Sequence, residues 1–310
     1  MSVIEVHNLT KQFPLPDGET LTAVDDISFA IEKGEIFGLL GPNGAGKTTT
    51  LEIIEGLQKP SKGRTAVLGF DSLKEVQKVK QRIGVQLQSS SFYDYLNLGE
   101  VLTLFGNFYP EQADPDELLT IVDLTEKKKS LVKELSGGQQ QRFSIAVSLV
   151  NNPEIVFLDE PTTGLDPQAR RHMWQFISKI NSQGKTVVLT THYMEEAEVL
   201  CDRIGIIDHG KVIALDTPEK LISDLEATAN LSFRLEKDVS AETFNGIEGV
   251  LESNKNGEGV YRLKISHASV SLPPLIQWAE QNNNRIRSVE IVRANLEDVF
   301  LHLTGSTLRE

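Results

Sequence analysis

Cysteine is nearly absent from this chain: Cys201 is the only one among 310 residues. A lone cysteine cannot form an intrachain disulfide, so a disulfide-stapled secreted fold is excluded and a reducing compartment is favoured. No apolar run approaches the roughly 20 residues that a membrane helix needs; the segment 144–150 is typical of the longest. The first residues also lack a basic segment followed by an apolar one, as a secretory signal would have. We therefore expect a cytoplasmic protein.

Positive charge is also scarce. The formal net charge is −13, with 31 Lys and Arg against 44 Asp and Glu. The cationic run Lys127–Lys129 stands alone and is typical of a solvated turn. A protein that binds the phosphate backbone of nucleic acid carries a basic patch, so nucleic acid is not expected as a partner.

What the chain does have is a regular alternation of apolar runs and helical patterns up to about residue 215. Four runs are apolar on both faces, which indicates central parallel strands covered by helices: 36–40, 155–158, 186–189 and 204–207. Ahead of the later three, residues 3–7 and 22–31 alternate as antiparallel strands do. The segment between Gln88 and Leu135 has no strand pattern and helical spacing at 98–108 and 115–124, so we expect an inserted helical lobe at about 89–150.

A second, smaller unit is expected at 225–310, after a first domain at 1–224 that closes with a helix at 218–224. Residues 230–237, 247–253, 259–265 and 285–293 are strand-like, and Asn256-Gly257 is a hairpin signal. Helical patterns cover 272–283 and 295–303, the latter with Asn295 as N-cap. The fold class is therefore α/β, with a small C-terminal α+β domain.

The segment Gly41–Thr48, GPNGAGKT, fits the phosphate-loop pattern and stands between a buried strand and a helical stretch. Its glycines let the backbone wrap a phosphate chain, and N–H groups at the helix start face the negative charge. Lys47 would pair with the β- and γ-phosphates, and the Thr48 hydroxyl would bind Mg²⁺. The candidate nucleotide-binding residues here are Gly41, Asn43, Gly44, Ala45, Gly46, Lys47, Thr48 and Thr49.

Two carboxylates, Asp159 and Glu160, end the apolar run Ile155–Leu158. The carboxyl ends of parallel strands meet at one edge of a sheet, so these side chains are expected beside the phosphate loop. Asp159 can then reach Mg²⁺ and Glu160 can polarise the attacking water.

A third motif, Leu135-Ser136-Gly137-Gly138-Gln139, stands 20 residues before Asp159 (159 − 139 = 20). In this order, between a phosphate loop and a carboxylate strand, it resembles the signature of ABC ATPases over roughly residues 1–220. The resemblance implies a P-loop ABC cassette with a mostly parallel sheet, an antiparallel β subdomain and an inserted helical lobe, which binds and hydrolyses ATP with Mg²⁺.

Four further positions match the family pattern. Gln88, with Gln86 as a competing choice, resembles the glutamine that joins Mg²⁺ and the attacking water to the lobe. Asp166 ends the segment Gly164–Asp166, which resembles the loop that meets the opposite subunit, and His192 resembles the switch histidine on the γ-phosphate. Phe13 stands where the family usually has a Tyr that stacks on adenine, and its ring keeps the π-face for this.

The resemblance also implies partners. Two cassettes pack head to tail, so that Ser136, Gly137, Gly138, Gln139 and Asp166 of one subunit complete the ATP site of the other. A second ABC ATPase subunit is therefore expected, with a homodimer favoured because both half-sites look intact. A separate transmembrane permease is expected too, which would hold the chain peripherally at the inner face of the cell membrane.

The C-terminal segment Asn295–Gly305, NLEDVFLHLTG, resembles the ending of cassettes that serve exporters of drugs, antibiotics or polysaccharide, including the daunorubicin-resistance type. An exporter of drugs, lipids or polysaccharide is therefore the first hypothesis. An importer ATPase with a regulatory C-terminal domain remains an alternative, and a non-transport ABC ATPase a weaker one. The aromatic segment 92–96 lies where such cassettes receive the permease, although packing within the lobe would also explain it.

Overall fold

The computed structural model describes residues 1–305 except 17, 88–91, 94, 226–228 and 257–258. The chain divides into two compact units, with the division between Pro218 and Glu219. We call the first unit the cassette and the second the C-terminal unit, and each is described by itself. In the part of the chain that the structure describes, no helix is both long and apolar enough to cross a membrane.

A six-stranded sheet forms the centre of the cassette, in the order β10-β9-β3-β8-β7-β6. Five of its strands run parallel and β10 runs antiparallel to β9. The mostly parallel sheet predicted from the sequence is thus confirmed. Strand bounds are β3 Ile36–Leu40, β6 Ile83–Gln86, β7 Ile155–Asp159, β8 Thr186–Thr191, β9 Arg203–Asp208 and β10 Lys211–Asp216.

A four-stranded antiparallel sheet lies beside it, in the order β2-β1-β4-β5. β1 (Ser2–Pro14) and β2 (Thr20–Glu32) are the predicted antiparallel pair. The sequence did not predict β4 (Lys62–Val67) or β5 (Phe70–Asp71). β4 alternates little in polarity, and its place is determined by pairing with β1.

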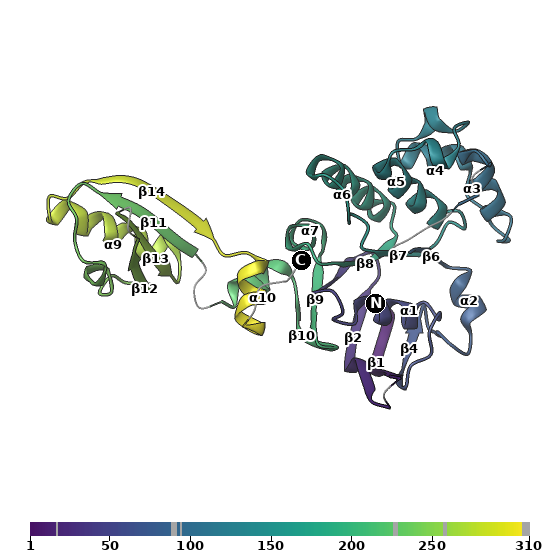
Figure 1. Cartoon of the computed structure of the whole chain (residues 1–310), viewed down its shortest axis with the longest axis horizontal. Helices are drawn as coiled ribbons and strands as arrows, with labels where there is room; N and C mark the ends of the chain where they lie inside the picture. Colours follow the sequence, from purple (N-terminus) through teal and green to yellow (C-terminus); the bar gives the residue numbers. More distant parts are fainter. Residues whose placement is uncertain (17, 88–91, 94, 226–228, 257–258, 306–310) are drawn as a thin grey trace. The chain divides into compact units, whose positions relative to one another are not determined.

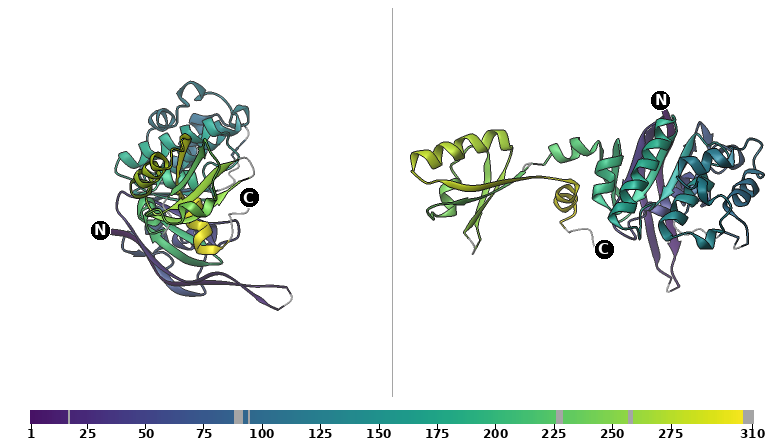
Figure 2. Two further views of the ribbon diagram at one scale, coloured as in Figure 1. Left: turned by 90° about the vertical axis from the view of Figure 1, so that its left-hand side faces the viewer. Right: turned by 90° about the horizontal axis from the view of Figure 1, so that it is seen from above.

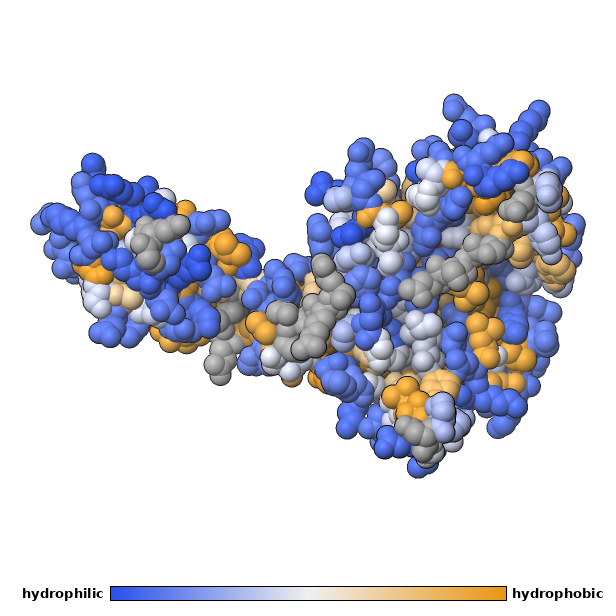
Figure 3. Space-filling model, viewed as in Figure 1, coloured by the Kyte–Doolittle hydropathy of each residue, from blue (hydrophilic) through white to orange (hydrophobic). Residues whose placement is uncertain are grey.

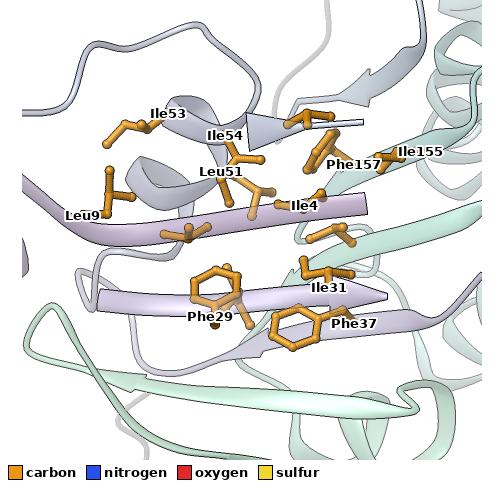
Figure 4. Packing of buried hydrophobic residues seen from close by; sticks show 14 of the residues in the cluster. Ile4, Leu9, Phe29, Ile31, Phe37, Leu51, Ile53, Ile54, Ile155 and Phe157 are labelled. Atoms are coloured by element: carbon orange, nitrogen blue, oxygen red, sulfur yellow. The ribbon is translucent and has the colours of Figure 1, made fainter. Parts of the chain in front are cut away.

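The core of the cassette lies between these two sheets, around α1 (Lys47–Ile54). α1 contacts β7 on one side and β1, β2 and β4 on the other. Figure 4 shows Leu51, Ile53 and Ile54 of this helix among side chains of both sheets, and the rings of Phe29 and Phe37 stacked at 5.5 Å. Close packing of this core holds the start of α1 at the carboxyl ends of the parallel strands.

Helices α6 (Pro167–Ser182) and α7 (Met194–Leu200) lie on the opposite face of the parallel sheet from α1 (Figure 1). α6 contacts β8, and α7 contacts β3 and β8. Both helices begin shortly after a strand end that carries candidate site residues.

The predicted helical lobe is present between β6 and β7 (Figure 1). It contains α3 (Leu98–Gly106), α4 (Pro115–Ile121), α5 (Gly137–Ser148) and the short turns η1 (Thr125–Lys127) and η2 (Val132–Glu134). Among its described residues there is no strand, only one isolated bridge between Asn97 and Leu131. The shorter α2 (Val76–Lys80) precedes β6.

The C-terminal unit contains a four-stranded antiparallel sheet in the order β12-β13-β11-β14. Buried and exposed residues alternate along β11, and α9 lies along one face of the sheet (Figure 2). The predicted order of strands and helices is confirmed: α8 Pro218–Ser223, β11 Ala229–Leu235, β12 Val250–Lys255, β13 Val260–Ile265, α9 Ala268–Gln281, β14 Ile286–Arg293 and α10 Leu296–Thr304. The short turn η3 (Ala241–Phe244), between β11 and β12, was not predicted. The start of α9 differs from the prediction, since Pro273 and Pro274 lie inside the helix.

Candidate active site

The phosphate loop joins the end of β3 to the start of α1, and two of its glycines are required by close packing. A Cβ on Gly41 would lie 2.1 Å from the Ile207 carbonyl oxygen, and one on Gly46 would lie 2.3 Å from that of Ala23. Gly46 also has a φ of +102°, which residues with a side chain rarely adopt. The glycine spacing in the sequence thus reflects a tightly confined turn.

Lys47 is buried, and its Nζ lies at the centre of the loop. It donates to the carbonyl oxygens of Gly41 at 2.8 Å and Pro42 at 3.1 Å. It also lies 3.4 Å from Oε1 of Glu160. Burial lowers the pKa of Lys47, while the neighbouring Glu160 and Asp159 charges oppose that change.

Asp159, at the end of β7, meets the start of α1. The Thr48 hydroxyl donates to its Oδ1 and Oδ2 at 3.2 and 3.1 Å. The Thr190 hydroxyl of β8 also donates to Asp159 Oδ1. A hydroxyl and a carboxylate side by side form an oxygen-rich pair of the kind that Mg²⁺ prefers.

Glu160 follows directly and has a left-handed backbone conformation, with a φ of +48°. Its N–H donates to the Thr190 hydroxyl at 3.0 Å, which fixes this turn against β8. Such strain in a residue other than glycine is concentrated at functional sites, because the surrounding structure must compensate for it.

Two side chains besides Lys47 lie next to the Glu160 carboxylate. The Thr163 hydroxyl donates to Oε2 at 3.0 Å, and His192 Nδ1 lies 3.3 Å from the same atom. Burial opposes ionisation of Glu160, but Lys47 and His192 outweigh it and hold the pKa of this carboxyl below its usual value. Glu160 is therefore an ionised carboxylate at neutral pH, as a water-polarising base must be.

A second carboxyl near this site, that of Glu55, has a raised pKa, whereas the pKa of Glu160 is lowered. Glu55, at the end of α1, is 3% exposed. Burial, with the Asp159 and Glu52 charges, raises the pKa of Glu55 to about 8. No pattern in the sequence indicates that this acid is buried.

Three further predicted residues remain: Gln88, its alternative Gln86, and Phe13. Gln88 falls outside the described residues. Gln86, the competing choice, is buried at the end of β6, and its side-chain oxygen has no hydrogen-bond partner in the described structure. Phe13 lies in β1, with the Lys11 ammonium 4.8 Å from its ring centroid.

The signature residues form a separate arrangement at the start of α5. Ser136 is the N-cap: its hydroxyl accepts from the Gln139 N–H at 3.4 Å, and the Gln139 side chain accepts from the Ser136 N–H at 3.0 Å. Ser136 and Gly137 are exposed. Asp166 is likewise an exposed N-cap, of α6, and accepts from the Ala169 N–H at 2.8 Å. No hydrogen bond among the described residues joins Ser136–Gln139 to the phosphate loop.

The structure thus brings together Lys47, Thr48, Asp159, Glu160 and His192, and leaves the signature and Asp166 apart. The sequence did not predict two residues that contact this group: Thr163, which bonds Glu160, and Thr190, which bonds Asp159. Thr190 lies near the end of β8, and a hydroxyl at the end of a predicted strand is a signal that could have indicated it.

A sequence profile of the family described as "ABC transporter" matches residues 24–163. The linearmycin resistance ATP-binding protein LnrL of Bacillus subtilis (strain 168) is 38% identical over 298 residues, covering 93% of this chain and 96% of that protein. The daunorubicin resistance ATP-binding protein DrrA3 of Streptomyces coeruleorubidus is 33% identical over 297 residues, covering 93% and 92%.

Among solved structures, the chain is similar to the dimeric ATP-binding cassette MJ0796 in a post-hydrolysis state bound to ADP and Pi. The identity is 30% and the TM-score 0.63, and the match covers 69% of this chain and 98% of that one.

Proposed function

Because this chain belongs to the ABC transporter family, as an ATP-binding subunit that hydrolyses ATP, we propose that it powers a separate membrane permease that exports drugs, lipids or polysaccharide. The catalytic part of this proposal rests on the Glu160 carboxylate, which lies 3.4 Å from Lys47 Nζ and 3.3 Å from His192 Nδ1. The similarity to resistance proteins along nearly the whole chain supports the export part.

In the proposed reaction Glu160 holds and polarises the attacking water, and His192 contacts the γ-phosphate. Lys47 pairs with the β- and γ-phosphates, and the loop Gly41–Thr49 provides backbone N–H groups. Thr48 and Asp159, with Gln88, would hold Mg²⁺, which supplies charge neutralisation at the phosphates when bound. The Thr48–Asp159 hydrogen bonds support this assignment, since they place two oxygen donors together beside the loop.

The site is proposed to be completed by a second copy of the chain. Ser136 is the N-cap of α5, so the exposed signature presents a helix N-terminus, which favours a bound phosphate. The ATP held by the phosphate loop of a second copy would supply that phosphate. The dimeric MJ0796 cassette supports this arrangement by similarity. If two chains share the site, its assembly depends on protein concentration by mass action. ATPase activity per mole of protein should then fall on dilution into the range where light scattering reports monomer. Constant activity through that range would contradict the shared site.

The permease is proposed to bind the cassette beside the helical lobe. Of the aromatic residues expected there, Phe92 packs against Phe105 and Phe143, as the packing alternative requires. Tyr93 and Tyr95 are 63% and 87% exposed and are available for a partner. This contact would hold the chain at the inner face of the membrane.

We retain 1–224 as the part that binds ATP, with 225–310 as an accessory domain. Every proposed catalytic residue precedes residue 193, and the C-terminal unit has its own core around Phe233, Phe244 and Tyr261. A chain ending at Asp224 is expected to fold and bind MgATP; a folded truncation that cannot bind it would contradict the boundary.

The direction of transport is tested with the membrane protein that co-purifies with the chain. Inside-out vesicles that contain both proteins are expected to take up daunorubicin with MgATP, and vesicles with the Glu160→Gln chain are not. Uptake by right-side-out vesicles instead, dependent on an added solute-binding protein, would support an importer.

A further inference from the structure

Glu196 is a fully buried carboxyl that the proposed mechanism does not use. It lies in α7, four residues after His192, with 0% of its surface exposed. The Trp174 indole N–H of α6 donates to its Oε1 at 3.0 Å. Burying a carboxyl costs folding free energy unless polar groups form hydrogen bonds to it. The hydrogen bonds of Glu196 therefore indicate what this side chain does.

Two further hydroxyls lie next to this carboxyl. Thr191 accepts from the Tyr193 N–H at 2.9 Å, so its own proton is available to another acceptor. The Thr162 hydroxyl is buried without a hydrogen-bond partner of normal geometry, and so is Glu196 Oε2. Burial raises the pKa of Glu196. The nearby donors of Thr191, Thr162 and Trp174 favour its charged form and oppose that rise.

These three neighbours belong to different parts of the site. Thr162 lies two residues after Glu160, and Thr191 directly precedes His192. Trp174 lies in the second turn of α6, the helix that begins at Asp166. One carboxyl therefore touches the segment of the proposed base, the segment of the switch histidine, and the helix of the partner-facing loop.

A second contact joins the same segments. The Arg170 guanidinium of α6 lies 3.8 Å from the centroid of the Tyr193 ring. That ring lies 4.1 Å from the His192 ring. α6 is thus attached to the His192 segment on both sides of the start of α7, and a shift of α6 would be passed to the histidine.

We propose that Glu196 is a positioning residue, which, together with Trp174, couples α6 to His192 and sets the place of the imidazole beside Glu160. The proposal rests on the proposed function, in which His192 acts on ATP. Glu196 itself touches no proposed substrate group. Its loss should therefore lower turnover and leave the binding of ATP by Lys47 and the phosphate loop intact.

The contact is tested first without activity. The chain has two tryptophans, Trp174 and Trp278, and the second lies in the C-terminal unit. A ¹H–¹⁵N spectrum of the indole groups therefore has two signals, of which Trp278 is an internal control. Glu196→Ala is expected to move the Trp174 signal and leave that of Trp278 in place. MgATP added to the Glu160→Gln chain is expected to move the Trp174 signal as well, and a Trp174 signal that ignores nucleotide would overturn the coupling.

Turnover is tested with matched variants of the full chain. Glu196→Ala is expected to lower kcat about tenfold or more, with the KM for MgATP little changed, because small misplacements of a catalytic group are costly. Glu196→Gln still accepts from Trp174 and should recover most of that loss. Equal losses in the Gln and Ala variants, or a loss confined to KM, would overturn the proposal.

A double-mutant cycle with His192→Ala separates this proposal from the proposed function. If Glu196 acts through His192, Glu196→Ala has little further effect in the His192→Ala chain. An undiminished effect there would overturn the positioning role, while leaving the ATPase assignment intact. Full activity of His192→Ala alone would instead contradict the role given to His192 in the proposed function.

Discussion

The two halves of the proposed ATP site differ in how their polar groups are satisfied. We define the phosphate half as Gly41–Thr48 with Asp159, Glu160 and His192. Its charged side chains Lys47, Asp159 and Glu160 are buried, and hydrogen bonds and ion pairs join the ends of β3, β7 and β8. The signature half, Ser136–Gln139 with Asp166, is largely exposed, and its side chains satisfy only their own helix ends.

This difference indicates which half depends on another molecule. The phosphate half is fixed by the packing of the cassette, so its geometry exists in a single chain. The signature half presents capped helix starts to solvent. In the proposed dimer, the phosphate that these helix starts bind belongs to the ATP of the second chain. On the face of the chain in view in Figure 3, hydrophilic residues make up most of the surface, with hydrophobic residues scattered among them.

The largest expected effect comes from changing the signature half alone. Ser136→Arg places a long cationic side chain at the start of α5, where the γ-phosphate of a partner's ATP would lie. Hydrolysis is expected to fall below detection, while ATP binding by the monomer stays nearly unchanged, since the phosphate half is untouched. Parallel ATPase and equilibrium-binding measurements check this, with Lys133→Arg as an exposed control; retained hydrolysis would mean that each chain works alone.

Next in size is a change to the chemistry of the phosphate half. Glu160→Gln removes the carboxylate that polarises water and keeps the shape of the side chain, so turnover should fall at least ~100-fold with MgATP still bound. Light scattering is expected to show dimer in the presence of MgATP. An unchanged kcat would exclude Glu160 from the mechanism.

A smaller effect concerns pH and arises from Glu55, at the end of the helix that follows the phosphate loop. The pKa of Glu55 is about 8 in the folded chain, against a usual value of 4.5. Between these values the folded chain binds a proton that the unfolded chain has lost, so the free energy of unfolding falls as pH rises. Relative to Glu55→Gln, the natural chain should lose about 2 kcal/mol of stability between about pH 5 and about pH 6.5. Denaturant unfolding without Mg²⁺ or nucleotide measures it, and parallel curves for both chains would refute it.

The smallest effect tests whether the signature half is held only by its own cap. Gln139→Ala removes the side chain that accepts from the Ser136 N–H and should cost about 0.5–1 kcal/mol of stability. Gln141→Ala, whose side chain makes no described hydrogen bond, is the control. A cost several times larger would show that Gln139 has contacts beyond the cap.

Sequence patterns predicted those parts of the site whose structure depends on residues adjacent in the chain. The glycine turn before Lys47 and the carboxylates after an apolar run could be read from the sequence, because strand ends and helix starts have distinctive residues. The meeting of these residues at one edge of the sheet could be predicted because the strands that precede them are parallel. The order of the C-terminal elements was also correct, since turn residues separate its short alternating runs.

Features that depend on distant partners could not be predicted. β4 contains Lys62, Gly63 and Arg64 and forms a strand only because β1 offers it an edge. Glu196 stands in the sequence Met194-Glu195-Glu196, where an acidic side chain indicates a solvated helix start. Only the packing of α6 over α7 buries it. The boundary of α9 was missed because prolines usually mark a first turn, whereas Pro273 and Pro274 lie further inside.

The left-handed backbone of Glu160 has an evolutionary consequence. A side chain in this conformation costs about 1–3 kcal/mol, and only glycine and, to a lesser degree, asparagine relieve it. Under the proposed mechanism, hydrolysis is what keeps a strained residue in this turn. In a duplicated cassette released from hydrolysis, drift at this position should favour glycine or asparagine and exclude branched residues such as valine. That lineage would gain stability as it lost catalysis, and a return to glutamate would require giving that stability up again.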